Sequence, residues 1–98
     1  MITLVATEVL YLSQGDEDAF FDWLKSIPCV SAVEGIGQDL MIRIKDANIG
    51  DPDLRELIAI FCRYSIDGKQ LKQFVTTTNA GWFKDNETSY WHEKVFRS

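Results

Sequence analysis

The residues that could carry chemistry in this 98-residue chain are few: one histidine, His92, and two cysteines, Cys29 and Cys62. A histidine acts as a general base only when a nucleophile or a substrate-positioning group lies within hydrogen-bond reach. The sequence indicates no such group, so His92 is predicted to be structural, with a small-molecule pocket at His92 as the alternative. The three residues also lack the spacing of a metal site. We therefore expect no catalytic residue, no metal site and no cofactor.

Four acids gather where a first helix is predicted to begin: Asp16, Glu17, Asp18 and Asp22. Such a cluster attracts a basic partner and raises the rate of association. The same residues would also complement the positive end of the helix dipole, so a purely structural role is the alternative. They make a poor catalytic pair, because acid–base chemistry needs a carboxyl group removed from water.

Aromatic residues gather in the last fifth of the chain, including Trp82, Phe83, Tyr90 and Trp91. Tryptophan dominates protein interfaces because it buries a large rigid area and keeps one polar group. Trp82 and Trp91 are therefore candidate anchors for a partner. The alternative is that the C-terminal segment packs on the core.

The composition is that of a folded domain, with 46% hydrophobic and 26% charged residues and a net charge of −5. Residues 1–49 hold eight acids and three bases, whereas residues 50–98 hold seven of each. This acidic half would repel nucleic acid and anionic lipid and attract a basic protein surface. We expect a protein partner rather than nucleic acid or a membrane, with homo-oligomerisation left open.

Hydrophobic periodicity predicts a strand over residues 2–12 and then a helix over 16–27, which Pro28 ends. Residues 29–34 and 39–45 are typical of a β-hairpin. A second helix is predicted to begin with Asp51 as N-cap and Pro52 in the first turn. We expect it to end at Asp67-Gly68.

This β-α-β-β-α order predicts a single α+β domain over residues 1–98, as a split βαβ or ferredoxin-like sheet with helices on one face. Residues 69–78 fit either a short helix, which we favour, or an edge strand. An aromatic, helical C-terminal tail is expected, with Thr88 or Ser89 as its cap.

The start of the chain lacks the basic region of a signal peptide, and no apolar run is long enough to cross a bilayer. Two isolated cysteines in such a chain are expected to be free, with a disulfide as the alternative. These features favour the cytoplasm.

The C-terminal third resembles a group of short bacterial proteins of about this length that have no assigned activity. The resemblance lies in these residues: Arg63-Tyr64, Ile66-Asp67, Gln70-Leu71, Gln73-Phe74, Trp82-Phe83, Asp85-Asn86, Tyr90-Trp91-His92 and Val95-Phe96. It implies a bacterial source and brings no activity, cofactor or site residue.

These features predict a small acidic protein-binding module. Its most concrete form is an immunity or inhibitor protein that neutralises a toxin, such as a nuclease, because a nuclease needs a basic site to hold phosphate. Asp16, Glu17, Asp18 and Asp22 would steer the partner, and Trp82 and Trp91 would anchor it. One alternative is a small-molecule sensor or small enzyme with a pocket near His92. Another is a domain that associates with itself through a strand edge.

Overall fold

A three-stranded antiparallel sheet and several helices make up the computed structural model of this chain, which describes residues 2–97. This confirms the predicted α+β class. The elements follow in this order: β1 (Ile2–Thr7), α1 (Gln14–Ser26), β2 (Val30–Ile36), β3 (Asp39–Ile44), α2 (Asp51–Arg63), the 3-10 helix η1 (Gly68–Phe74), α3 (Ala80–Phe83) and α4 (His92–Phe96).

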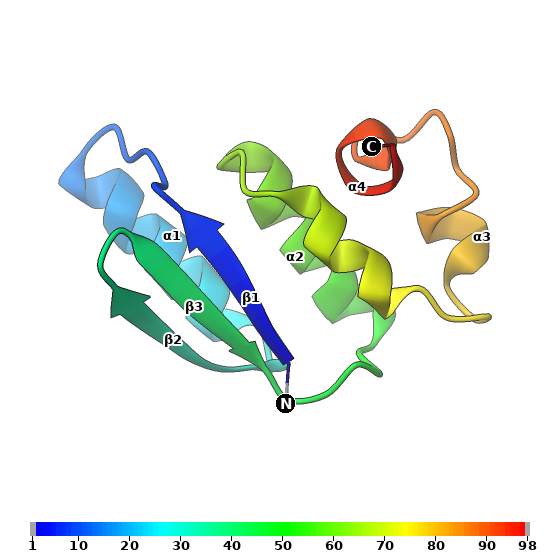
Figure 1. The fold of residues 1–98 in the computed structure, drawn as a ribbon, viewed down its shortest axis with the longest axis horizontal. Helices are drawn as coiled ribbons and strands as arrows, with labels where there is room; N and C mark the ends of the chain where they lie inside the picture. Colours follow the sequence, from blue (N-terminus) through cyan, green and yellow to red (C-terminus); the bar gives the residue numbers. More distant parts are fainter. Residues whose placement is uncertain (1, 98) are drawn as a thin grey trace.

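The sheet has the strand order β1-β3-β2, with β3 antiparallel to both neighbours. Leu4 of β1 lies opposite Ile42 of β3, and both side chains are fully buried. The residues that alternate with Leu4 along β1 point to the other face, where Thr3 and Thr7 are exposed. In Figure 1, α1 lies behind the sheet, α2 and the yellow-green 3-10 helix η1 lie on the β1 side, and α3 and α4 lie beyond them.

The first strand ends at Thr7, so the predicted strand over residues 2–12 is wrong beyond that point. Glu8 has a positive φ of 51°, which turns the chain out of the strand. Its N–H still donates to the carbonyl of Gln38, at 3.1 Å. The four residues Val9–Leu12 then form a loop, in which Val9 and Tyr11 pack against the core while Leu10 and Leu12 are exposed.

The ends of both long helices differ in detail from the prediction. Ser13 caps α1 by accepting the N–H of Asp16 at 3.2 Å. The cap of α2 is Gly50 rather than Asp51, and no side chain caps that end. At the other end, α2 stops at Arg63, ahead of the predicted Asp67-Gly68.

The early stop of α2 has a local cause at Ser65, which takes a left-handed φ of 56°. The N–H of Ile66 then donates back to the carbonyl of Phe61 at 2.9 Å, as in a Schellman motif. Such a cap is usually made by glycine, which the sequence lacks at this position, so the sequence prediction placed the end at the next glycine.

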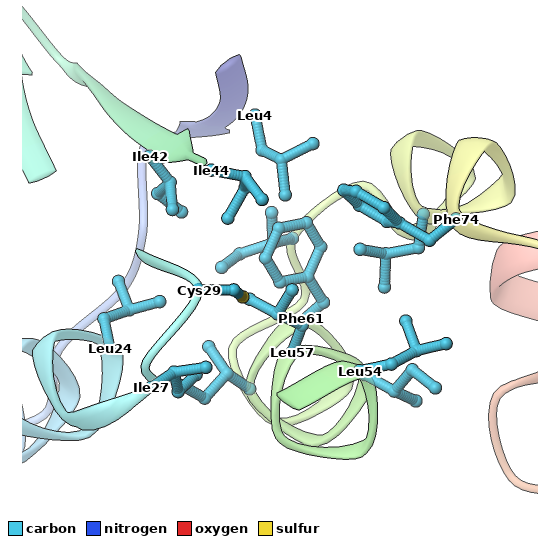
Figure 2. Close-up of a cluster of buried hydrophobic side chains, with 14 of the residues drawn as sticks. Leu4, Leu24, Ile27, Cys29, Ile42, Ile44, Leu54, Leu57, Phe61 and Phe74 are labelled. Atoms are coloured by element: carbon cyan, nitrogen blue, oxygen red, sulfur yellow. The ribbon is translucent and has the colours of Figure 1, made fainter. Parts of the chain in front are cut away.

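The core lies between the sheet and the two long helices (Figure 2). In that view side chains from three elements point toward one another. They are Leu24 of α1 with Ile27 at its end, Leu57 and Phe61 of α2, and Ile44 of β3. Phe74 of η1 extends the same cluster toward α3 and α4. The apolar stripes that predict the helices therefore also define the core.

The tail begins with η1, so the short-helix alternative for this region matches the structure better than an edge strand. Gly68 allows η1 to lie close to α4, because a Cβ atom at this position would lie 3.0 Å from the carbonyl oxygen of Lys94. The N-cap of α4 is Trp91, without a side-chain bond, so the predicted cap at Thr88 or Ser89 is wrong.

Gln70 of η1 occupies the middle of the free edge of β1. Its side-chain Oε1 accepts the N–H of Val5, and its Nε2 donates to the carbonyl of Val5 at 2.8 Å. A side-chain amide thus takes the place of a neighbouring strand at that residue.

No helix within residues 2–97 is long and apolar enough to span a membrane.

Candidate functional site

Asp16, the first of the predicted steering acids, ties three segments together. Its carboxylate accepts the N–H of Leu12 and the hydroxyl of Tyr64, both at 2.9 Å. The Leu12 N–H and the Tyr64 hydroxyl hold the pKa of the Asp16 carboxyl below its ordinary value. Asp16 therefore fixes the end of the Val9–Leu12 loop against α1 and the end of α2.

Of the other predicted acids, Asp18 and Asp22 are exposed and Glu17 is half-buried. Gln14 donates to Glu17 at 3.3 Å and to Asp18 at 2.9 Å, while Asp22 is exposed one turn further along α1. These bonds lie on the helix surface, so they leave the charges open to a partner. The structure thus places one of the four acids in a structural role and three at the surface.

The loop carries two leucines that the sequence prediction had placed on a strand. Leu10 is 74% exposed and Leu12 is 84% exposed, more than any other large hydrophobic side chain in the described chain. Glu8 gave the available signal, because it breaks the apolar alternation at the residue where the strand ends. We call Leu10 and Leu12 together the leucine loop.

A cleft of about 410 Å³ lies between the leucine loop, α1 and the turn that joins β2 to β3. It is lined by the following residues: Glu8, Val9, Leu10, Tyr11, Glu17, Phe21, Gly35, Gly37, Gln38, Asp39 and Leu40. Glu17 belongs both to this lining and to the acidic cluster predicted from the sequence. The leucine loop, the cleft and the surface acids of α1 therefore form one continuous candidate site.

The two predicted tryptophan anchors lie at the other end of the molecule. Trp91 is only 8% exposed, and its indole N–H donates to the carbonyl of Phe83 at 2.8 Å. Trp82 is half-buried, with its N–H on Asp51 at 3.1 Å and the guanidinium of Arg55 over its ring at 3.9 Å. The structure does not bring either tryptophan to the acidic cluster.

His92 lines a separate hollow of about 630 Å³ with Ser89, Tyr90, Glu93 and other tail residues. The hydroxyl of Ser89 is buried and has no hydrogen-bond partner within residues 2–97. It is not bonded to His92, whose ring instead lies 5.6 Å from that of Phe96. The hollow thus holds a histidine and a serine without the contact that would activate the serine.

Cys29 and Cys62 are both free thiols. Burial, followed by the carboxylate of Asp53, raises the pKa of Cys29 to about 11. At about pH 8 roughly one Cys29 thiol in a thousand is then ionised, and only the thiolate reacts with alkylating agents.

We expect iodoacetamide to alkylate Cys29 at least about a hundredfold more slowly in the folded protein than after unfolding in guanidinium chloride.

Peptide mass spectrometry over a time course measures that rate, and the unfolded protein serves as the control for intrinsic reactivity. Equal rates in the two states would contradict a buried Cys29.

Comparison of the chain with family models, with curated proteins and with solved structures gives no match. Within residues 2–97, no group of three or more histidine, cysteine, aspartate or glutamate side chains is placed to hold a metal ion.

Proposed function

We propose that this chain is a protein-binding module that docks a basic partner on the leucine loop and the surrounding acids. Its most concrete form is an immunity or inhibitor protein that neutralises a toxin, such as a nuclease. The partner would cover Leu10 and Leu12 while its bases meet the carboxylates of Glu8, Glu17 and Asp18.

The exposure of the leucine loop carries this proposal. Two leucines that are 74% and 84% exposed lie within three residues of one another on a loop. Each would gain about 1.5–3 kcal/mol from full burial, and the described structure buries neither of them. Asp16 anchors the loop through Leu12, so the leucines are held in place before a partner arrives. A prepositioned apolar patch with a charged rim is typical of protein interfaces.

The charge around this patch favours a basic partner. Glu8 and Glu17 line the cleft together with Leu10, and a second hollow beside Leu10 and Leu12 holds Glu8, Asp16 and one base, Arg63. Asp18 and Asp22 add two exposed carboxylates on α1. Opposite charge speeds association and penalises acidic competitors. An enzyme that holds phosphate must present a basic site, so an acidic domain can occupy that site in place of the nucleic acid.

We further propose that the sheet has a ferredoxin-like topology. The parallel strands β1 and β2 flank β3 and are joined through α1, which supports a split βαβ arrangement of ferredoxin-like type that lacks a strand beyond β1. The two free thiols support a cytoplasmic location.

Replacing both leucines, Leu10→Ser with Leu12→Ser, should weaken partner binding at least tenfold. The fold should persist, because neither side chain belongs to the core. Tagged wild-type protein and the double variant are used to capture partners from a bacterial lysate at low and moderate salt. Mass spectrometry then compares the proteins that each retains.

The matched control is Tyr90→Ser, which removes an exposed large hydrophobic side chain, 61% accessible, from the tail. A basic protein retained by wild type and by the Tyr90→Ser variant, lost from the leucine variant and weakened by salt, supports the proposal. Equal retention by the wild type and the leucine variant removes the leucine loop from the interface.

The alternative of a sensor or small enzyme is supported only by the hollow that His92 and Ser89 line. A metabolite that copurifies with the wild-type protein and is lost on His92→Ala would favour it. A monomer mass independent of concentration would exclude self-association through a strand edge.

A further inference from the structure

The walls of the cleft beneath the leucine loop are aromatic and aliphatic. Tyr11 and Phe21 contribute two rings whose centroids lie 6.3 Å apart at an interplanar angle of 38°. Val9 and Leu40 extend the apolar lining, and all four side chains are half-buried. The cleft thus offers apolar walls that a slender, uncharged stem could contact.

The charge of this cleft is negative and is not balanced by bases in its lining. Its lining contains three acids, Glu8, Glu17 and Asp39, and no arginine or lysine. The other three hollows described for this structure each include at least one such base. Within residues 2–97, none of the three acids forms an ion pair within 4.0 Å. The cleft is therefore complementary to a cation.

Two observations place charge beside the rings themselves. Burial, followed by the nearby Glu17 carboxylate, raises the pKa of the Tyr11 hydroxyl above its ordinary value. On Phe21, the ammonium of Lys25 already lies 5.8 Å from the ring centroid. The Tyr11 ring therefore lies near the carboxylate of Glu17, and the Phe21 ring already lies near the ammonium of Lys25.

We propose that this cleft receives an arginine side chain of the partner protein, with the three-carbon stem between the apolar walls and the guanidinium among Glu8, Glu17 and Asp39. This inference rests on the proposed function, because it specifies what the basic partner inserts.

Arginine fits this site better than lysine. Its planar guanidinium stacks on aromatic faces and is more weakly hydrated than an ammonium group, so it leaves water at lower cost. The same chain shows this mode at its other end, where Arg55 lies over the Trp82 ring at 3.9 Å. Its five donors can also bond more than one carboxylate at a time.

The test uses the peptide acetyl-Ala-Arg-Ala-amide and ¹⁵N-labelled full-length protein. Titration at low salt should produce saturable amide shifts at Val9, Tyr11, Gly37 and Leu40. The same peptide with citrulline in place of arginine keeps the shape and loses the charge, and it should produce no saturable shift. The lysine peptide should bind more weakly than the arginine peptide.

The variant Glu8→Gln with Asp39→Asn removes two charges from the cleft. Neither side chain accepts a hydrogen bond within residues 2–97, so the fold should be unaffected. The arginine peptide should bind roughly fivefold more weakly for each charge removed. The matched control, Asp85→Asn with Glu87→Gln, removes two exposed acids from the tail and should leave binding unchanged.

Absent cleft shifts, or equal shifts with the citrulline peptide, would overturn the inference. The lysate experiment with the leucine variant remains independent of this result. Leucine-dependent capture of a basic protein without arginine binding would leave the proposed function standing and the arginine assignment wrong.

Discussion

Replacing Trp91 with alanine should destabilise the protein by about 3–5 kcal/mol, because a buried ring of this size leaves a cavity in the tail. The ring is 8% exposed, packs edge-on against Trp82 with centroids 6.0 Å apart, and gives its N–H to Phe83. A domain of this length has about 5–15 kcal/mol of stability in total, so the variant would lose much of it. Guanidinium unfolding followed by circular dichroism measures the change.

The companion variant Trp91→Phe keeps a six-membered ring and removes the pyrrole part of the indole together with its N–H. It should cost less, about 1–3 kcal/mol, because the carbonyl of Phe83 loses its partner. Trp82→Ala should also cost less than Trp91→Ala, since that ring is half-buried. If Trp91→Ala leaves the unfolding midpoint unchanged, Trp91 is not part of the core and its role as an anchor regains support.

Asn79→Ala should destabilise the protein by about 2–4 kcal/mol, and the loss should come from hydrogen bonds rather than from apolar packing. Asn79 is 2% exposed and is the one buried polar residue in residues 2–97. Its amide donates to the carbonyl of Phe74 at 2.9 Å, and its Oδ1 accepts the N–H of Thr76 at 2.8 Å. Alanine would leave the buried carbonyl of Phe74 and the part-buried N–H of Thr76 without a partner.

The control for this variant is Asn48→Ala, which removes an exposed side chain from a loop and should change stability by less than about 0.5 kcal/mol. Both variants are compared with wild type by the same unfolding experiment. Equal midpoints for Asn79→Ala and Asn48→Ala would show that water satisfies the Phe74 and Thr76 groups.

The elements with strong periodicity could be predicted from the sequence, and the irregular segments could not. In α2 the spacing of Leu54, Leu57 and Phe61 fixes both the helix and its buried face. The tail offers only short helices, whose positions depend on particular contacts such as Gly68 against Lys94. Local patterns carry no information on which distant segment a residue will meet.

The candidate site was half predictable. The acids of α1 are visible in the sequence, and three of the four lie at the surface. The cleft could not be foreseen, because it depends on Glu8 turning the chain out of β1 and on the β2–β3 turn meeting that loop. The alternating pattern past Glu8 predicts that Leu10 and Leu12 continue the buried face of the strand. The positive φ at Glu8 ends the strand instead, and both side chains are exposed to solvent.

The bonds between Gln70 and Val5 bear on how copies of this chain could assemble. A fibre grows by edge pairing only when each copy can pair on two sides, one for the copy before it and one for the copy after it. Gln70 holds the middle of the β1 side, whereas no side chain within residues 2–97 bonds the backbone of β2 in this way. Two copies that paired through their β2 edges would leave only the β1 edges, which Gln70 blocks. Assembly by edge pairing would therefore stop at a dimer.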